Sequence, residues 1–206
     1  MKTASRRSSL AVTLMGMLLE EPMHAYRMQK LIRERGKHKV VNVRQKTSVY
    51  QTLERLLRLG LIEIRDTVQT GDHPDRTVYA ISNLGRDTTK AWLREMLVTV
   101  GEEFPEFPAA LATLTVLRAD DARKQLGMRS DAVRKELNKL DAARRKTGDL
   151  PRLFLLEDEY RAALLKAELV WIQSVIAELR DGSLVWNKQW LKDIAAKFSP
   201  NDEDLP

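Results

Sequence analysis

The hydrophobic pattern of the first hundred residues changes its period once and then changes back, and this order restricts the fold more than any other feature. Apolar residues recur every three or four positions in three successive stretches, at residues 10–19, 23–35 and 47–60. This spacing is typical of helices with one buried face. Leu10, Leu14 and Leu18 mark such a face in the first stretch. The sequence therefore predicts three helices before residue 61.

Two short runs rich in β-branched residues come next, at residues 61–65 and 77–81. The polar segment between them, residues 66–76, contains glycine and proline and predicts a hairpin with a long tip. Ser82 is suited to cap a fourth helix over residues 83–98. Helix, helix, helix, hairpin and helix is the order of a winged helix-turn-helix, so residues 1–99 are expected to form a DNA-binding domain of that fold.

A break at residues 100–108, with two prolines and three glutamates, predicts a linker. Residues 109–199 are expected to be helical and residues 200–206 to be a polar tail. The fold class is thus mainly α, with the small sheet making it α+β. One predicted helix spans residues 151–180, and its part from Leu153 to Arg180 would be about 42 Å long.

Apolar residues along this long helix recur with an average step of about 3.7 residues, the period of one continuous face. A face of that length is difficult to bury within a small domain, so the sequence predicts that a second copy of the chain covers it. The expected dimer interface consists of Leu156, Tyr160, Leu164, Ala167, Trp171 and Val175.

The excess of basic over acidic residues lies entirely in the first half. Residues 1–99 hold 18 Lys and Arg against 10 Asp and Glu, whereas residues 100–206 hold 17 against 19. This asymmetry favours a polyanion as the partner of the first domain. Arg6 and Arg7 before an apolar run raise the alternative of an export signal, but the run spans ten residues and has no cleavage site. We therefore expect a cytoplasmic protein with no membrane partner.

The third helix has one polar face that suits the major groove. With 100° per residue, Thr47, Ser48, Gln51 and Arg55 lie opposite the apolar side. Arginine can bind guanine and glutamine can bind adenine through paired hydrogen bonds. Arg44 and Lys46, just before the helix, are better placed for phosphates.

The hairpin tip offers His73 between two aspartates, which raises the alternative of a metal site. No second histidine is near, so His73 and Arg76 are expected to contact phosphate or the minor groove instead. The chain has no cysteine, which excludes disulfides, thiolate metal sites and cysteine nucleophiles. It also has no catalytic or nucleotide-binding signature. We expect no enzyme activity, no catalytic residue, no cofactor and no metal.

Three motifs in order over residues 8–99 resemble the PadR-type transcriptional regulators. Glu-Pro-Met-His-Ala-Tyr at residues 21–26 is similar to the family's opening of the second helix, with Ala25 in place of glycine. Residues 47–56 and 60–62 resemble its recognition helix and the entry to the wing, with Val49 and Gln51 in place of leucine and proline. Residues 76–86 look like its return strand and the start of its fourth helix. Residues 155–186 have the look of the dimerisation domain in longer members.

The resemblance implies a homodimer that binds double-stranded DNA at an inverted repeat, usually as a repressor, and is released by a small apolar or aromatic effector. It also implies that Tyr26 and Tyr50 lie near the DNA backbone, and that Trp92 lines an effector cavity, although a plain core tryptophan is the alternative. A cytoplasmic adaptor whose winged helix binds protein is the competing function.

Overall fold

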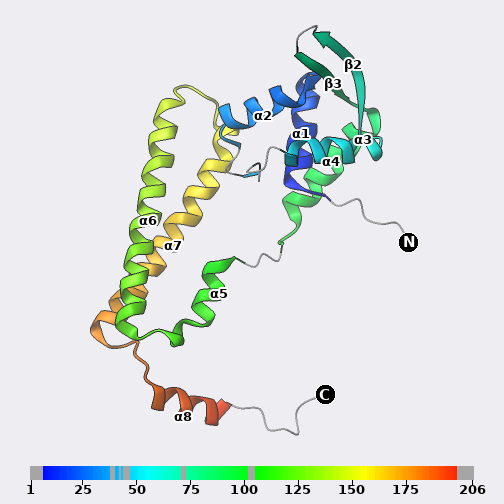
Figure 1. The fold of residues 1–206 in the computed structure, drawn as a ribbon. Coiled ribbons are helices and arrows are strands. Elements are labelled where there is room, and N and C mark those ends of the chain that lie inside the picture. Colours follow the sequence, from blue (N-terminus) through cyan, green and yellow to red (C-terminus); the bar gives the residue numbers. More distant parts are fainter. Residues whose placement is uncertain are drawn as a thin grey trace. The chain divides into compact units, whose positions relative to one another are not determined.

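A computed structural model of the chain describes residues 7–37, 40, 41, 43, 47–70, 73–101 and 105–198, without the side chains of residues 67–70 and 73–76. The chain divides into two compact units, Met1–Glu102 and Glu103–Pro206. The described part of the first unit combines helices with a small sheet, and that of the second is helical (Figure 1).

The first unit has the predicted order of a winged helix-turn-helix. Its elements are α1 (Ser9–Glu20), β1 (Met23–His24), α2 (Ala25–Glu34), α3 (Thr47–Arg58), β2 (Ile62–Thr70), β3 (His73–Ile81) and α4 (Asn83–Val98). The three strands form an antiparallel sheet in the order β1-β3-β2. Figure 1 shows the long hairpin of β2 and β3. The fold class predicted from the sequence is confirmed.

Two details of this unit differ from the prediction. Met23 and His24 were expected to begin the second helix, but they pair with Tyr79 and Val78 of β3 as a short strand. Pairing with β3 determines the structure of these two residues in place of the helical period, and α2 begins at the next residue, Ala25. The expected long hairpin tip is largely strand, because β2 and β3 pair as far as Thr70 and His73.

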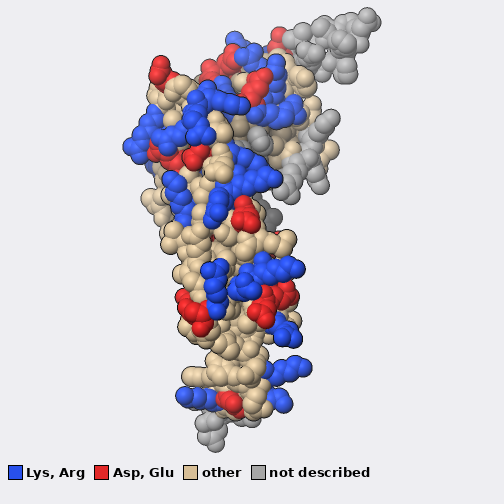
Figure 2. Space-filling model, turned by 90° about the vertical axis from the view of Figure 1, so that its left-hand side faces the viewer, with Lys and Arg blue, Asp and Glu red and all other residues tan. Residues whose placement is uncertain are grey.

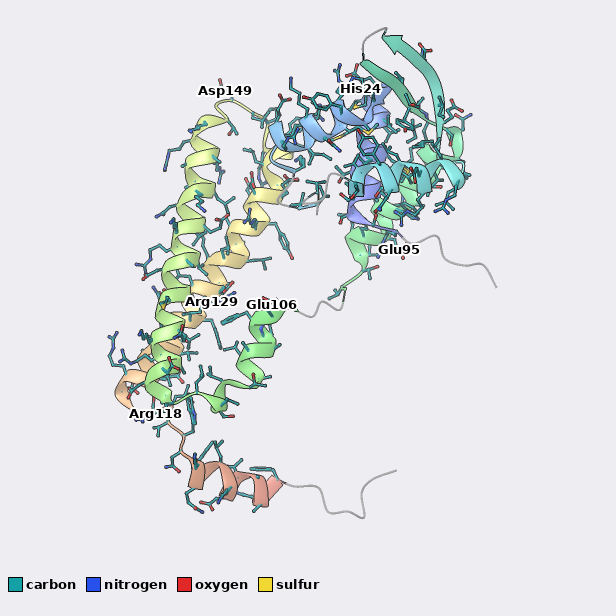
Figure 3. The ribbon with its side chains drawn as sticks, in the orientation of Figure 1. His24, Glu95, Glu106, Arg118, Arg129 and Asp149 are labelled. Carbon is teal, nitrogen blue, oxygen red and sulfur yellow. The ribbon has the colours of Figure 1, made fainter. Side chains whose placement is uncertain are left out.

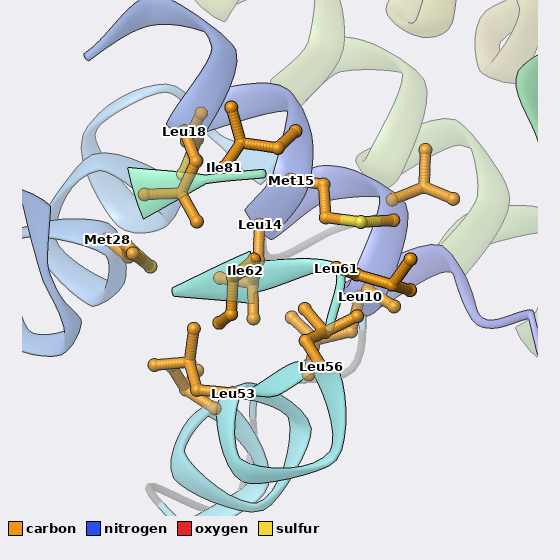
Figure 4. Packing of buried hydrophobic residues seen from close by; sticks show 14 of the residues in the cluster. Leu10, Leu14, Met15, Leu18, Met28, Leu53, Leu56, Leu61, Ile62 and Ile81 are labelled. Carbon is orange, nitrogen blue, oxygen red and sulfur yellow. The ribbon is translucent and has the colours of Figure 1, made fainter. Parts of the chain in front are cut away.

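The core of the first unit is built around α1. Leu14 and Met15 are fully buried, and Leu10 and Leu18 are 8% and 2% exposed. Figure 4 shows Leu14, Leu53 and Ile62 directed into one core from α1, α3 and β2. The first apolar stretch is therefore a core helix, and no helix in the described part of the chain is long and apolar enough to cross a membrane.

The start of α4 is fixed to the end of α3 and the start of β2. The Ser82 hydroxyl accepts the Gly85 N–H at 3.0 Å and donates to the Gly60 carbonyl at 2.7 Å. The Ser82 N–H donates to the Leu61 carbonyl at 3.2 Å. A Cβ on Gly85 would lie 1.9 Å from that same carbonyl oxygen, so this position requires glycine. Ser82 is the N-cap that the sequence predicts.

The second unit is an arrangement of helices. Its elements are α5 (Glu106–Ala112), η2 (Leu114–Val116), α6 (Ala119–Lys146), η3 (Arg152–Leu155), α7 (Leu156–Asp181) and α8 (Lys188–Phe198). α6 and α7 pack side by side (Figure 1) around Leu126, Val133, Leu137 and Ile172. Figure 2 views the side on which α6 lies and shows basic and acidic atoms interspersed there.

α5 begins inside the stretch 100–108 that the sequence predicts as a linker. Pro105 is its N-cap and Pro108 is its third residue. The first N–H groups of a helix have no partner within the helix, so proline in the first turn removes no hydrogen bond. The prolines that indicated a break in the sequence therefore begin a helix.

α7 has two apolar faces rather than the single face that its period predicted. Ala162, Leu165, Leu169, Ile172, Ile176 and Leu179 pack in or against the core shared with α6. At 100° per residue, this face is about 140° from the predicted stripe. Most of the predicted stripe is exposed. The sequence analysis did not identify the packed face, because apolar residues of both faces alternate along the helix and neither face stands out by its period.

Candidate nucleic-acid interface

The outward face of α3 is polar, and its inward face holds the helix in place. Val49, Leu53 and Leu56 are at most 1% exposed. Thr47 and Gln51 are exposed on the opposite side, and Ser48 is half-buried. The Gln51 amide is therefore held on a fixed helix and directed to solvent, as a residue that reads base edges requires.

Arg55 occupies a different position from the one its place in the helical wheel predicts. It is half-buried, and its Nη2 donates to the Ser8 hydroxyl at 3.1 Å. Ser8 is the N-cap of α1, where the same hydroxyl accepts the Ala11 N–H at 3.2 Å. Arg55 thus joins α3 to the start of α1 and is less exposed than Thr47 and Gln51 on the same helix.

A hollow of about 380 Å³ lies beside this junction. Its walls come from the first turn of α1 and from the outward face of α3, and include Ser8, Ser9, Ser48, Gln51 and Arg55. Three of the predicted DNA-contacting residues, Ser48, Gln51 and Arg55, therefore surround one polar depression.

Two tyrosines, one on α2 and one on α3, are exposed. Tyr26 on α2 is 60% exposed and its ring stacks on His24, with 6.3 Å between centroids. Figure 3 shows His24 at the start of α2, where its Nδ1 accepts the Arg27 N–H at 3.0 Å. Tyr50 on α3 is 47% exposed. Both residues therefore present about half of their surface or more to solvent.

Tyr79 on β3 connects the wing to α3. Burial raises the pKa of Tyr79, and the charges of Tyr50 and Glu54 raise it further. Tyr79 therefore stays a neutral hydroxyl beside α3 throughout the physiological range.

The charges around α1 and α2 are partly neutralised by ion pairs. Arg35 contacts Glu20 through two hydrogen bonds of 2.6 and 2.7 Å, and Arg27 pairs with Glu21. The Arg35 hydrogen bond lowers the pKa of Glu20, an effect only partly opposed by burial. The net excess of positive charge consequently depends on other residues of the unit, among them exposed Arg58 and Arg65.

Arg65 is a candidate that sequence reasoning missed. The pairing of β2 with β3 shifts register between Ile64 and Asp66, on either side of Arg65, and the side chain is exposed. Such a bulge redirects a side chain. Nothing in the sequence indicated it, because a bulge depends on how two strands pair.

The remaining predicted DNA contacts lie in parts of the chain that the structure does not describe, and the predicted effector residue lies in the core. Arg44 and Lys46 lie outside the described residues, as do the side chains of His73 and Arg76. Trp92 is 9% exposed within the core of the first unit, as the alternative interpretation expected. No cluster of metal-ligating side chains occurs among the described residues.

The predicted dimer stripe is largely solvent-exposed in the single chain. Leu156, Tyr160, Leu164 and Trp171 are 44–68% exposed, and Ala167 is exposed as well. Val175 differs, because it is half-buried against the core that α7 shares with α6. Its place between the two apolar faces of α7 explains this.

Known proteins resemble this chain in the sequence of its first unit and in its fold. Residues 14–91 match the profile of the transcriptional regulator PadR-like family. No curated protein sequence matches the chain significantly.

Solved structures share its fold. Bacillus subtilis PadR in complex with operator DNA is 16% identical, with a TM-score of 0.66 over 84% of this chain and 99% of that one. The same protein in complex with p-coumaric acid is 15% identical, with a TM-score of 0.67 over 83% and 98%. The Vibrio cholerae virulence activator AphA is 21% identical, with a TM-score of 0.65 over 84% and 99%.

Proposed function

We propose that this chain, which carries a PadR-like transcriptional regulator domain at residues 14–91, is a cytoplasmic homodimeric repressor. It binds double-stranded DNA at an inverted repeat and is released by a small apolar or aromatic effector. The observation that carries the proposal is the polar outward face of α3, with exposed Gln51 at its centre, on a helix whose other face is fully packed.

Gln51 contacts base edges in the major groove, and Arg55 with Ser8 contacts a backbone phosphate beside it. Thr47 and Ser48 add hydroxyl donors at the start of the same helix. Arg44 and Lys46 contact phosphates, and His73 and Arg76 contact phosphate or the minor groove. Tyr26 and Tyr50 lie near the DNA backbone. Base contacts supply sequence preference, whereas phosphate contacts supply affinity for any duplex.

Dimerisation through α7 covers the exposed stripe that contains Leu164 and Trp171. A two-fold dimer matches the symmetry of an inverted repeat, in which two recognition helices lie about 34 Å apart. The B. subtilis relative in complex with p-coumaric acid supports a small aromatic effector, since that protein shares the fold.

Fluorescence anisotropy tests the DNA-binding role. The protein is titrated against DNA from upstream of its own gene and against a scrambled duplex, at about 50 and 200 mM salt, a range over which non-specific contacts weaken steeply. We expect the upstream DNA to keep its advantage at the higher salt. Equal loss of both duplexes would instead favour the adaptor function.

Two substitutions separate the roles of the α3 side chains. Gln51→Ala is expected to weaken binding to the upstream DNA by about tenfold, the size of one base contact, and to leave the scrambled duplex unaffected. Arg55→Ala is expected to weaken both duplexes alike. Gln189→Ala, on the exposed surface of α8, is the matched control and is expected to change neither.

Sedimentation velocity tests the dimer. Leu164→Glu places a charge on the exposed stripe and is expected to yield monomers. Gln173→Glu adds the same charge to an exposed position of α7 outside both apolar faces, and is expected to leave the dimer intact. Monomeric wild-type protein at micromolar concentration would contradict the proposal.

A further inference from the structure

A hollow of about 410 Å³ lies within the helical unit, between α5, η2 and the first turns of α6. Hydrocarbon and aromatic side chains supply most of its wall, including Phe107, Ala110, Leu111, Leu114, Leu117 and Leu126. Its volume is within the range of sites for small organic molecules, about 300–1,000 Å³.

Among the described residues that line the hollow, Arg129 is the one with a charged side chain, and Glu168 compensates its charge. Its Nε donates to Glu168 Oε1 at 2.6 Å, and its guanidinium carbon lies 3.5 Å from the centre of the Phe107 ring. Figure 3 shows Arg129 on α6 and Glu106 at the start of α5. The wall therefore offers hydrogen-bond donors without a net charge, which favours an uncharged ligand over an ion.

The aromatic part of the wall is already in place. Phe107 lies between Arg129 and the edge of Trp171, whose ring is 6.2 Å away at an interplanar angle of 80°. At the other end, Trp186 Nε1 donates to the Leu117 carbonyl at 2.9 Å. These contacts, one at each end of the hollow, hold α5 and η2 against the rest of the helical unit, and none of them requires a ligand.

We propose that this hollow is the effector site and binds an uncharged, largely hydrocarbon molecule of two or three rings with one hydrogen-bond acceptor. The rings lie against Leu111, Leu114 and Leu126, and the acceptor is directed to Arg129. The assignment of this ligand as an effector rests on the proposed function, whereas the binding site itself does not.

The hollow lies next to the segment that connects the helical unit to the first unit in sequence. α5 is the first helix after the connecting residues 99–105. A ligand that contacts both α5 and α6 fixes the point at which this connection enters the helical unit. Ligand binding can change DNA affinity only as far as the ligand favours one arrangement of the connection over another.

Titration with N-phenyl-1-naphthylamine, an uncharged fluorophore with three aromatic rings, tests the hydrocarbon part of the site. Its one heteroatom is an N–H donor, so the probe binds without the contact to Arg129. We expect saturable binding at one site per chain, with energy transfer from the nearby tryptophans. Ala110→Trp fills the hollow from an exposed position of α5 and is expected to weaken binding at least tenfold. Ala109→Trp is the matched control, because its neighbouring exposed position does not line the hollow.

The same samples are then titrated with the upstream DNA. We expect the fluorophore to weaken DNA binding by the wild type and by Ala109→Trp, and not by Ala110→Trp. Fluorophore binding that does not saturate, or that both tryptophan variants weaken alike, would overturn the site. Loss of the dimer in Ala110→Trp with unchanged fluorophore binding would overturn it too, and would assign the hollow to an interface between copies.

The two proposals fail separately. Saturable binding that has no effect on an intact DNA complex would overturn the effector role and leave the DNA-binding function standing. Absence of any specific DNA complex would overturn the proposed function, while the fluorophore titration still decides whether the hollow binds its ligand.

Discussion

Replacing Gly85 by alanine is expected to destabilise the first unit, although alanine is normally the better helix former. The added Cβ would lie 1.9 Å from the Leu61 carbonyl oxygen, and 2.9 Å from both the Leu61 carbonyl carbon and Ile81 Cγ1. Two of these three atoms are backbone, so a side-chain rotation cannot relieve the clash. The start of α4 must instead move away from β2, which weakens the bonds around Ser82.

The magnitude follows from two opposing effects. Forcing an extra methyl into a packed site costs about 3 kcal/mol at the upper end of the usual range. Alanine recovers about 1 kcal/mol of helix propensity. We therefore expect a net loss of about 2 kcal/mol in the free energy of unfolding, or a fall in Tm of roughly 8–16 °C for a domain of this size.

Thermal unfolding followed by circular dichroism measures this effect, and Gly16→Ala provides the control. Gly16 lies within α1, and nothing is within 4 Å of a Cβ added there. This control is expected to raise the Tm slightly, because only the propensity effect remains. If Gly85→Ala were as stable as Gly16→Ala, the close approach of α4 to Leu61 would be refuted.

Three further outcomes are expected. Ser82→Ala should lower the free energy of unfolding by about 1 kcal/mol through loss of the N-cap of α4, measured as a shift in the urea midpoint. Ile172→Ala should cost about 2–5 kcal/mol in the helical unit, because the side chain is fully buried between α6 and α7. Glu20→Gln should cost no more than about 1 kcal/mol near pH 7, because the pair with Arg35 is largely exposed. The pKa of Glu20 is lowered in the folded state. The stabilisation by the ion pair is therefore present above the unfolded pKa of about 4.3 and is lost as the pH falls through the folded pKa. The urea midpoints of the wild type and Glu20→Gln should converge toward pH 3.

Local signals predicted most of the first unit. The period of α1 and α3, the cap at Ser82 and the β-branched runs each depend on residues close together in sequence, and each was confirmed. The strand at Met23 and His24 was not predicted, because its cause is a partner more than fifty residues away on β3. The extent of the hairpin was underestimated for a similar reason: polar residues in paired strands resemble a loop.

The candidate site was only partly predictable. The sequence correctly separated the packed and polar faces of α3, since that division follows from helical geometry alone. It could not show that Arg55 donates to Ser8, because that contact joins two helices through the tertiary fold. The apolar hollow between α5 and α6 was missed as well, since its walls come from elements whose packing no local period specifies.

The bond between Arg55 and Ser8 also affects how such a protein can evolve. Mutation of Arg55 alters the polar face of α3, which we propose to contact DNA, and at the same time removes a donor from the cap of the core helix α1. A mutation at Gln51 has no such second effect, because that side chain is exposed. Among descendants with different operators, we therefore expect position 51 to vary freely and positions 8 and 55 to change together.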